Sequence, residues 1–248
     1  MNAEAGHRMH AGRRWALIRY GLAIALTALV GSGALYPGGT VLDGSTRGYS
    51  FTHNFLSDLG STVAFNDAHN MAGARLFTVA LIIGVAALAA SFVAAVRVLS
   101  ATAPARVFAR LAAAAGVLVC GGFVVVALAP VDRAFALHIM ATRIAIYAFP
   151  VGTALLGVAT WRDARFGARA MLGWWALAMV LVSFILVAHI GPRPTTEHGL
   201  TTQVLMQKLM AATVLAVLWI ESVEAERVAR VWPLSASQAR HPGAPPAA

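Results

Sequence analysis

Residues 71–96 read MAGARLFTVALIIGVAALAASFVAAV, a run of 26 residues in which Arg75 is the single charged side chain. As a helix this run would be about 39 Å long, and a bilayer has roughly 30 Å of hydrocarbon to cross. A helix that is apolar on every face belongs in a membrane or deep inside a large protein. The stretch therefore predicts a transmembrane helix.

Five further apolar runs have similar lengths. They cover residues 15–35, 107–129, 138–161, 170–190 and 199–221. The whole chain is 59% hydrophobic and 12% charged, with a mean hydropathy of +0.72, which is outside the range of ordinary soluble domains. We expect an all-α integral membrane protein with one six-helix domain over residues 15–221. A basic segment, 1–14, precedes it, and a partly disordered tail rich in proline and alanine, 222–248, follows it.

The first run contains 21 residues. The apolar region of a secretory signal peptide has about 7 to 15, so we expect an uncleaved first helix.

The basic residues predict the orientation of the bundle. The N-terminus, the second and fourth connections and the C-terminal tail share one side, which carries thirteen of them: Arg8, Arg13, Arg14, Arg19, Arg97, Arg106, Arg110, Arg162, Arg165, Arg169, Arg227, Arg230 and Arg240. The opposite side carries three, Arg47, Arg133 and Arg193. Because basic residues accumulate on the cytoplasmic side, we expect a multi-pass protein of the plasma membrane with both termini in the cytoplasm.

The net charge of +9 is spread between apolar runs instead of forming a patch with interleaved aromatic residues. We therefore expect membrane lipids as partners and no nucleic acid. The oligomeric state is not predicted.

The first outward connection contains a polar stretch, His53 to Gly60, that predicts a short amphipathic helix over residues 52–60. Thr52 is placed to cap it, and Phe51 and Leu56 have the spacing of a hydrophobic staple. At 100° per residue, Ser57 and Asp58 share one face. The sequence thus predicts a helix lying across the outward mouth of the bundle.

Most other polar residues of the apolar segments also fall on the outward side. Lys208 would lie about 13 Å into its helix, and a lysine at that depth requires a partner, for which we expect Asp58 or Asp132. Arg75 is expected to pair with Asp58, Asp67 or Asp132. The candidate ligand-binding residues are Ser57, Asp58, Arg75, Asp132, His138, Arg143 and Lys208.

Residues 50–77, with Leu56-Ser57-Asp58-Leu59-Gly60 and then Phe65-Asn66 before a helix, resemble the first-loop signature of the bacterial family called domain of unknown function 998. Pro130-Val131-Asp132 followed by His138 is similar to the family's turn between its third and fourth helices. The chain departs from the signature at Phe55-Leu56 and at His53. The resemblance implies a six-helix fold, distantly similar to membrane proteins of the autophagy-modulator type, with an outer site but no established reaction.

Four interpretations of the outward residues stay open. They form caps and ion pairs that hold the first connection onto the helix ends, or Arg75, Arg143 and Lys208 bind a lipid head group or another anion. A third is a metal-dependent hydrolase in which zinc is held by His69, His138 and either His189 or His198, with Asp58 activating water beside Ser57. No H-E-x-x-H motif supports it, and the other interpretations need no cofactor. The fourth is a small-solute transporter, for which no clear internal repeat is present.

Overall fold

The computed structural model describes residues 2–231, with side-chain surroundings from residue 15 onward. In this part of the chain the regular elements are all helical, and two isolated β-bridges lie in the first connection. The elements are α1 (Asn2–Leu35), the short 3₁₀-helix η1 (Leu56–Gly60), α2 (Met71–Val98), α3 (Ala103–Leu128), α4 (Phe135–Trp161), α5 (Ala168–Ile190) and α6 (Glu197–Val231).

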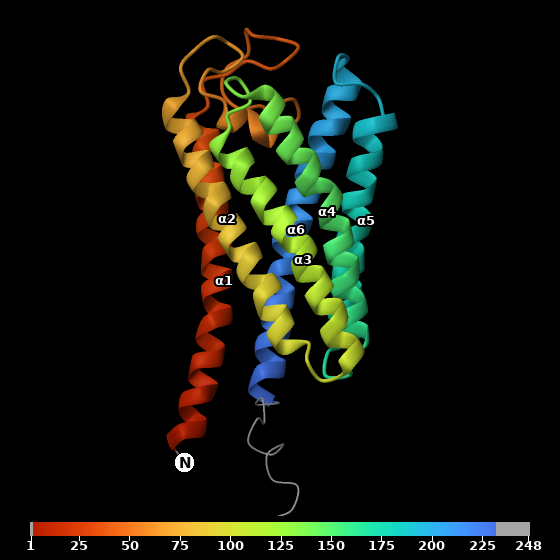
Figure 1. Cartoon of the computed structure of the whole chain (residues 1–248). Coiled ribbons are helices and arrows are strands. Elements are labelled where there is room, and N and C mark those ends of the chain that lie inside the picture. The colour runs from red at the N-terminus through yellow and green to blue at the C-terminus, as the bar shows by residue number, and fades with distance from the viewer. Residues whose placement is uncertain (1, 232–248) are drawn as a thin grey trace, which may run out of the picture.

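The six long helices form a ring. Each packs against the next helix in the sequence, and α6 closes the ring by packing against α1 (Figure 1). The start of α1 and the end of α6 lie at one end of the bundle, here called the terminal end, and residues 36–70 cover the opposite end, here called the loop end (Figure 1). Within residues 2–231, six helices are long and apolar enough to cross a membrane, which confirms the predicted class of fold.

Three helix ends differ from the predicted boundaries by four residues or more, and the largest difference is that α1 begins at Asn2 instead of residue 15. α3 begins at Ala103 instead of residue 107, because the Thr102 hydroxyl accepts a hydrogen bond from the Ala105 N–H at 3.2 Å and caps the helix. α6 continues ten residues past 221, so residues 222–231 of the predicted tail are helical. An ion pair between Glu226 and Arg19 of α1, 2.6 Å long, holds that extension in the bundle. Residues 232–248 of the predicted tail lie outside the described residues.

α3 and α4 approach each other closely because small residues line their contact. Ala105, Ala109 and Ala112 are fully buried along α3. At Gly122 a Cβ atom would lie 2.7 Å from the carbonyl oxygen of Ala141 in α4, so only glycine fits there. Small residues let helix backbones pack tightly in a membrane, and this pair forms one wall of the ring.

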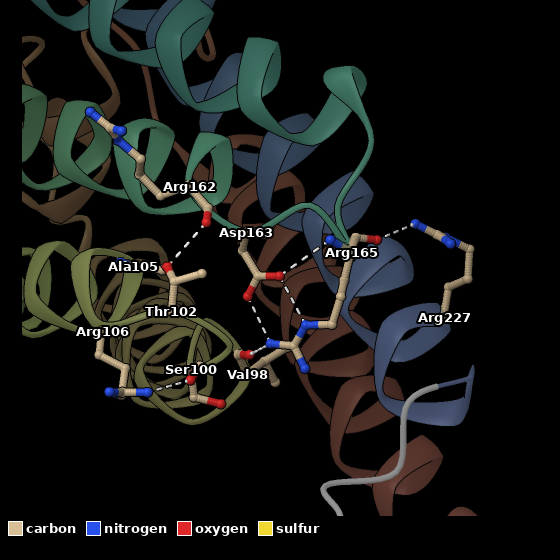
Figure 2. Close-up of polar contacts among 9 residues, drawn as sticks. All are labelled: Val98, Ser100, Thr102, Ala105, Arg106, Arg162, Asp163, Arg165 and Arg227. Carbon is tan, nitrogen blue, oxygen red and sulfur yellow. Dashed lines mark hydrogen bonds and ion pairs between the residues drawn. The ribbon is translucent and has the colours of Figure 1, made fainter.

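The connections at the terminal end are joined by hydrogen bonds and ion pairs, shown in Figure 2. Arg165, in the α4–α5 connection, donates from Nε and Nη2 to both oxygens of the fully buried Asp163 carboxylate, at 2.8 and 2.7 Å. Its Nη2 also donates to the Val98 carbonyl at the end of α2, and Arg227 of α6 donates to the Arg165 carbonyl at 3.2 Å. These contacts tie three elements together with a bidentate, charge-assisted pair at their centre.

Candidate functional site

Residues 36–70 fold back on themselves to make a cover over the loop end of the ring. The turn at Gly38 and Gly39 has positive φ angles of 137° and 81°. At Gly39 a Cβ atom would lie 2.4 Å from the backbone nitrogen of Asn66, so this position needs glycine for both its conformation and its packing. The first and last parts of the connection thereby pack against each other.

The helix within this cover is shorter than the predicted 52–60 element. It begins at Leu56, and Thr52 does not cap it but contacts the His53 Nδ1 atom at 2.8 Å. The reason is Asn54, whose side-chain oxygen accepts the Ser50 N–H at 2.9 Å. Such side-chain to backbone hydrogen bonds compete with helix, and here they hold residues 50–54 in turns.

Asn54 is also the centre of a buried polar network. Its Nδ2 group donates to the Gly39 carbonyl at 2.9 Å and to Asp58 Oδ2 at 3.3 Å. The Phe55 N–H donates to the same carboxylate oxygen at 2.8 Å. From α6, the Lys208 ammonium donates to the Asn54 carbonyl at 2.6 Å. Asn54 therefore links the cover to the ring of helices.

Lys208 and Asp58 are connected through Asn54, and no direct ion pair joins them among the described residues. The Lys208 Nζ atom lies 5.1 Å from the ring centroids of both Tyr49 and Phe51, within the range of cation–π attraction. Lys208 thus contacts a carbonyl and two aromatic rings. The predicted partner Asp58 is linked to it through Asn54. Lys208 holds the cover in place, and its charge is already enclosed by protein groups.

Burial raises the pKa of Asp58 from its ordinary value of 3.8 to about 6, although the hydrogen bonds from Asn54 and Phe55 and the charge of Lys208 oppose the shift. Removing a carboxylate from water disfavours its charged form, and two N–H donors compensate for only part of that cost. A group with this pKa changes its charge near the lower edge of the physiological range.

Asp132, in the α3–α4 turn, holds the other side of the cover. Its carboxylate accepts hydrogen bonds from the Thr62 N–H at 3.0 Å, the Thr62 hydroxyl at 2.5 Å and the Val63 N–H at 3.2 Å. Partial burial opposes ionisation, but these three donors hold the pKa of Asp132 below its ordinary value. Asp132 is thus occupied with fastening the cover to the α3–α4 turn.

A cavity of about 600 Å³ lies inside the ring beneath this cover. Its walls come from α1, α2, α3, α4 and α6 and are almost entirely apolar, while Ser57 and Asp58 of η1 lie at its outer end. Along α6 the lining runs from Gln207 to Leu218, a distance of about 16 Å at 1.5 Å per residue. That depth is about half of a roughly 30 Å hydrocarbon core, and so about one leaflet.

Two side chains of α4 place polar atoms on this apolar wall. His138 is buried, and its Nδ1 atom lies 2.7 Å from the Ala129 carbonyl. A carbonyl can only accept, so Nδ1 carries the hydrogen, and Nε2 of the neutral ring is left with a lone pair. One turn further on, the buried Thr142 hydroxyl has no hydrogen-bond partner. On the opposite wall, Gln207 of α6 accepts the Leu56 N–H at 2.7 Å.

The structure brings together part of the predicted site. Ser57, Asp58 and His138 line the cavity, whereas Asp132 and Lys208 hold the cover above it. Arg75 and Arg143 are exposed on the outside of the bundle and do not line the cavity. Arg75 makes no ion pair with Asp58, Asp67 or Asp132 among the described residues. The predicted cationic cluster of Arg75, Arg143 and Lys208 is therefore dispersed.

The four histidines of the zinc interpretation are also dispersed. His189 is exposed, with the Tyr147 hydroxyl at 2.7 Å from its Nε2 atom, and His69 and His198 are exposed elsewhere at the loop end. Among the described residues, no group of three or more His, Cys, Asp or Glu side chains is placed to hold a metal ion.

Asn54, Thr142 and Gln207 were not among the candidates from sequence. Asn54 follows His53 in the sequence, and Gln207 precedes Lys208. Thr142 could have been identified from its spacing, because it follows His138 by four residues and so shares its helix face.

Comparisons with known protein families, with curated proteins and with solved structures find no match to this chain. The resemblance of residues 50–77 to domain of unknown function 998 therefore stays a prediction.

Proposed function

We propose that this protein is a lipid-binding protein of the plasma membrane that holds the apolar chain of a lipid in the cavity beneath residues 36–70. The observation that carries the proposal is the apolar cavity of about 600 Å³, about one leaflet deep. Lipid binding was expected at a cationic cluster, but Arg75 and Arg143 lie outside the cavity. The apolar chain, not a charged head group, supplies the main binding energy.

The size of the cavity argues for an occupant. The cavity is partly open to its surroundings, and across its volume the apolar side chains that line it lack packing partners unless something fills it. Water is a poor filler because each buried water needs two to four polar partners, and these walls offer few. In a bilayer, the surrounding lipids supply hydrocarbon chains that fit an apolar space.

We also propose that the terminal end faces the cytoplasm. Of the eighteen Lys and Arg residues within 2–231, twelve belong to segments on that side. The loop end, and with it the opening of the site, then belongs to the outer leaflet. A cysteine introduced at exposed Asp43 should react with a membrane-impermeant thiol reagent added to intact cells.

The test is a pair of neighbouring substitutions on α6. Ala211 lines the cavity, whereas Ala212 is exposed on the outside of the bundle. Ala211→Phe should fill part of the cavity and lower the amount of lipid that survives purification in detergent, measured by mass spectrometry of the extracted protein. Ala212→Phe adds the same side chain and should leave that amount unchanged. Equal lipid content in both variants and in the unaltered protein would overturn the proposal.

A further inference from the structure

The polar atoms on the cavity wall specify the kind of head group, provided that the cavity holds a lipid as proposed above. Three of them have no hydrogen-bond partner within the described residues: the Thr142 hydroxyl, the His138 Nε2 atom and Asp58 Oδ1. Of these, the Thr142 hydroxyl is fully buried. A buried polar atom without a partner destabilises the folded state, so such atoms in a native protein call for an explanation.

These atoms mainly accept hydrogen bonds. Nε2 of His138 has a lone pair because Nδ1 donates to the Ala129 carbonyl. Asp58 Oδ2 is taken by the Asn54 and Phe55 N–H groups, which leaves Oδ1. The Thr142 hydroxyl can both donate and accept. His138 and Thr142 are four residues apart on one face of α4, with their side chains about 5–6 Å apart at Cβ, close enough to share one ligand group.

The cavity lining contains no lysine or arginine. Lys208 of α6 is directed at the cover, where its ammonium group contacts the Asn54 carbonyl and two aromatic rings. A phosphate in this place would have no lysine or arginine in the lining to pair with directly, which is unfavourable. The carboxyl group of Asp58 makes an anionic head group still less favourable.

We infer that the ligand is a lipid with an uncharged hydroxyl head group, which donates to His138 or Asp58 and accepts from Thr142. This class covers long-chain alcohols, glycerides with a free hydroxyl and lipid quinols. A phospholipid head group does not fit the wall, although its acyl chains would fit the apolar part.

The test uses three probes with the same chain: a long-chain primary alcohol, its methyl ether and its monophosphate. Binding to the delipidated protein in detergent is measured by competition against a fluorescent fatty alcohol. The alcohol should bind about tenfold more tightly than the ether, because the ether oxygen cannot donate. The phosphate should bind most weakly.

A matched pair of variants ties this preference to Thr142. Thr142→Val has nearly the same shape but no hydroxyl, so it should weaken binding of the alcohol about fivefold or more and change binding of the ether less. Thr142→Ser should keep the preference. Because valine removes an unpaired buried hydroxyl, the thermal stability of the lipid-free protein should not fall, which separates loss of binding from loss of folding.

The outcomes distinguish this inference from the proposed function. If all three probes bind and the alcohol has no advantage over the ether, or the phosphate binds most tightly, the hydroxyl preference is wrong and lipid binding stands. If no probe binds to a folded protein, both fail.

Discussion

The two ends of the ring both carry hydrogen-bonded polar networks, but they enclose very different amounts of space. At the terminal end, Asp163 and Arg165 satisfy each other with two hydrogen bonds, and the cavity beside Trp174 and Glu221 is only about 30 Å³, room for one or two waters. At the loop end, a network around Asn54 supports a cover over about 600 Å³ of apolar space. Within the described residues, each end has a buried side-chain oxygen without a hydrogen-bond partner, Glu221 Oε1 at the terminal end and Thr142 Oγ1 at the loop end, so the ends differ in the size of the space beside these atoms.

The largest loss of stability is expected at the terminal end. Asp163→Ala should destabilise the protein by about 4 kcal/mol, because it removes one partner of a buried ion pair and leaves the Arg165 guanidinium, 15% exposed, without its carboxylate. The free energy of unfolding in detergent measures this loss. Lipid content per folded molecule should not change. Arg227→Ala, which removes the exposed pair with Glu224 and one exposed hydrogen bond to the Arg165 carbonyl, should cost only about 1 kcal/mol or less and serves as the comparison.

A stability loss below about 1 kcal/mol for Asp163→Ala, or a loss of lipid from the folded variant, would contradict the assignment of this end to structure alone.

At the loop end, the titration of Asp58 should make the unfolding free energy depend on pH. Burial raises its folded-state pKa to about 6 from an ordinary 3.8, so the folded protein binds this proton more tightly than the unfolded chain. The stabilisation from the bound proton is fully present below about pH 4 and is lost as the pH rises through about 6. Its size is on the order of 3 kcal/mol.

The difference in unfolding free energy between the unaltered protein and Asp58→Asn, measured from pH 4 to pH 7, isolates this contribution from other carboxylates. As the pH rises from 4 to 7, the unfolding free energy of the unaltered protein should fall relative to that of Asp58→Asn. A difference independent of pH would show that the site does not titrate in this window. Asp132→Asn is the matched control, since the pKa of Asp132 is lowered and its contribution is lost in the opposite direction, as the pH falls.

The smallest of the three effects is expected from the link between α6 and the cover. Lys208→Met keeps most of the buried stem but removes the hydrogen bond to the Asn54 carbonyl, at a cost of about 2 kcal/mol. Because the Tyr49 hydroxyl also donates to that carbonyl, at 3.1 Å, the carbonyl keeps one partner. Limited proteolysis should cut the variant faster within residues 36–70 than within the terminal-end connections. Equal cutting at both ends would contradict the role of Lys208 in holding the cover.

The helical fold was predictable because a run such as 71–96 has few other options in water or in lipid. Every backbone polar group must be paired inside a bilayer, so an apolar run of that length becomes a helix whatever its neighbours are. The boundaries were less predictable. α6 extends to Val231 because Glu226 reaches Arg19 of α1, a contact between residues far apart in the sequence.

The site was only partly predictable, and Arg75 and Lys208 show why. Both are single cations in apolar runs, and both were expected to face acidic partners inside the bundle. The structure turns Arg75 outward and Lys208 inward. A helix that is apolar on nearly all faces has little periodicity to fix its rotation about its own axis, so packing against neighbours decides it.

From the sequence alone it was predictable that this chain has six helices long and apolar enough to cross a membrane, and that Ser57, Asp58 and His138 lie at the same end of the bundle. Length and hydropathy carry that information locally. The tertiary structure alone decided that Asn54 ties Lys208 to Asp58, and that an apolar cavity lies beneath the cover with Thr142 in its lining. A cavity is a property of how several helices meet, and no single stretch of sequence encodes the space between them.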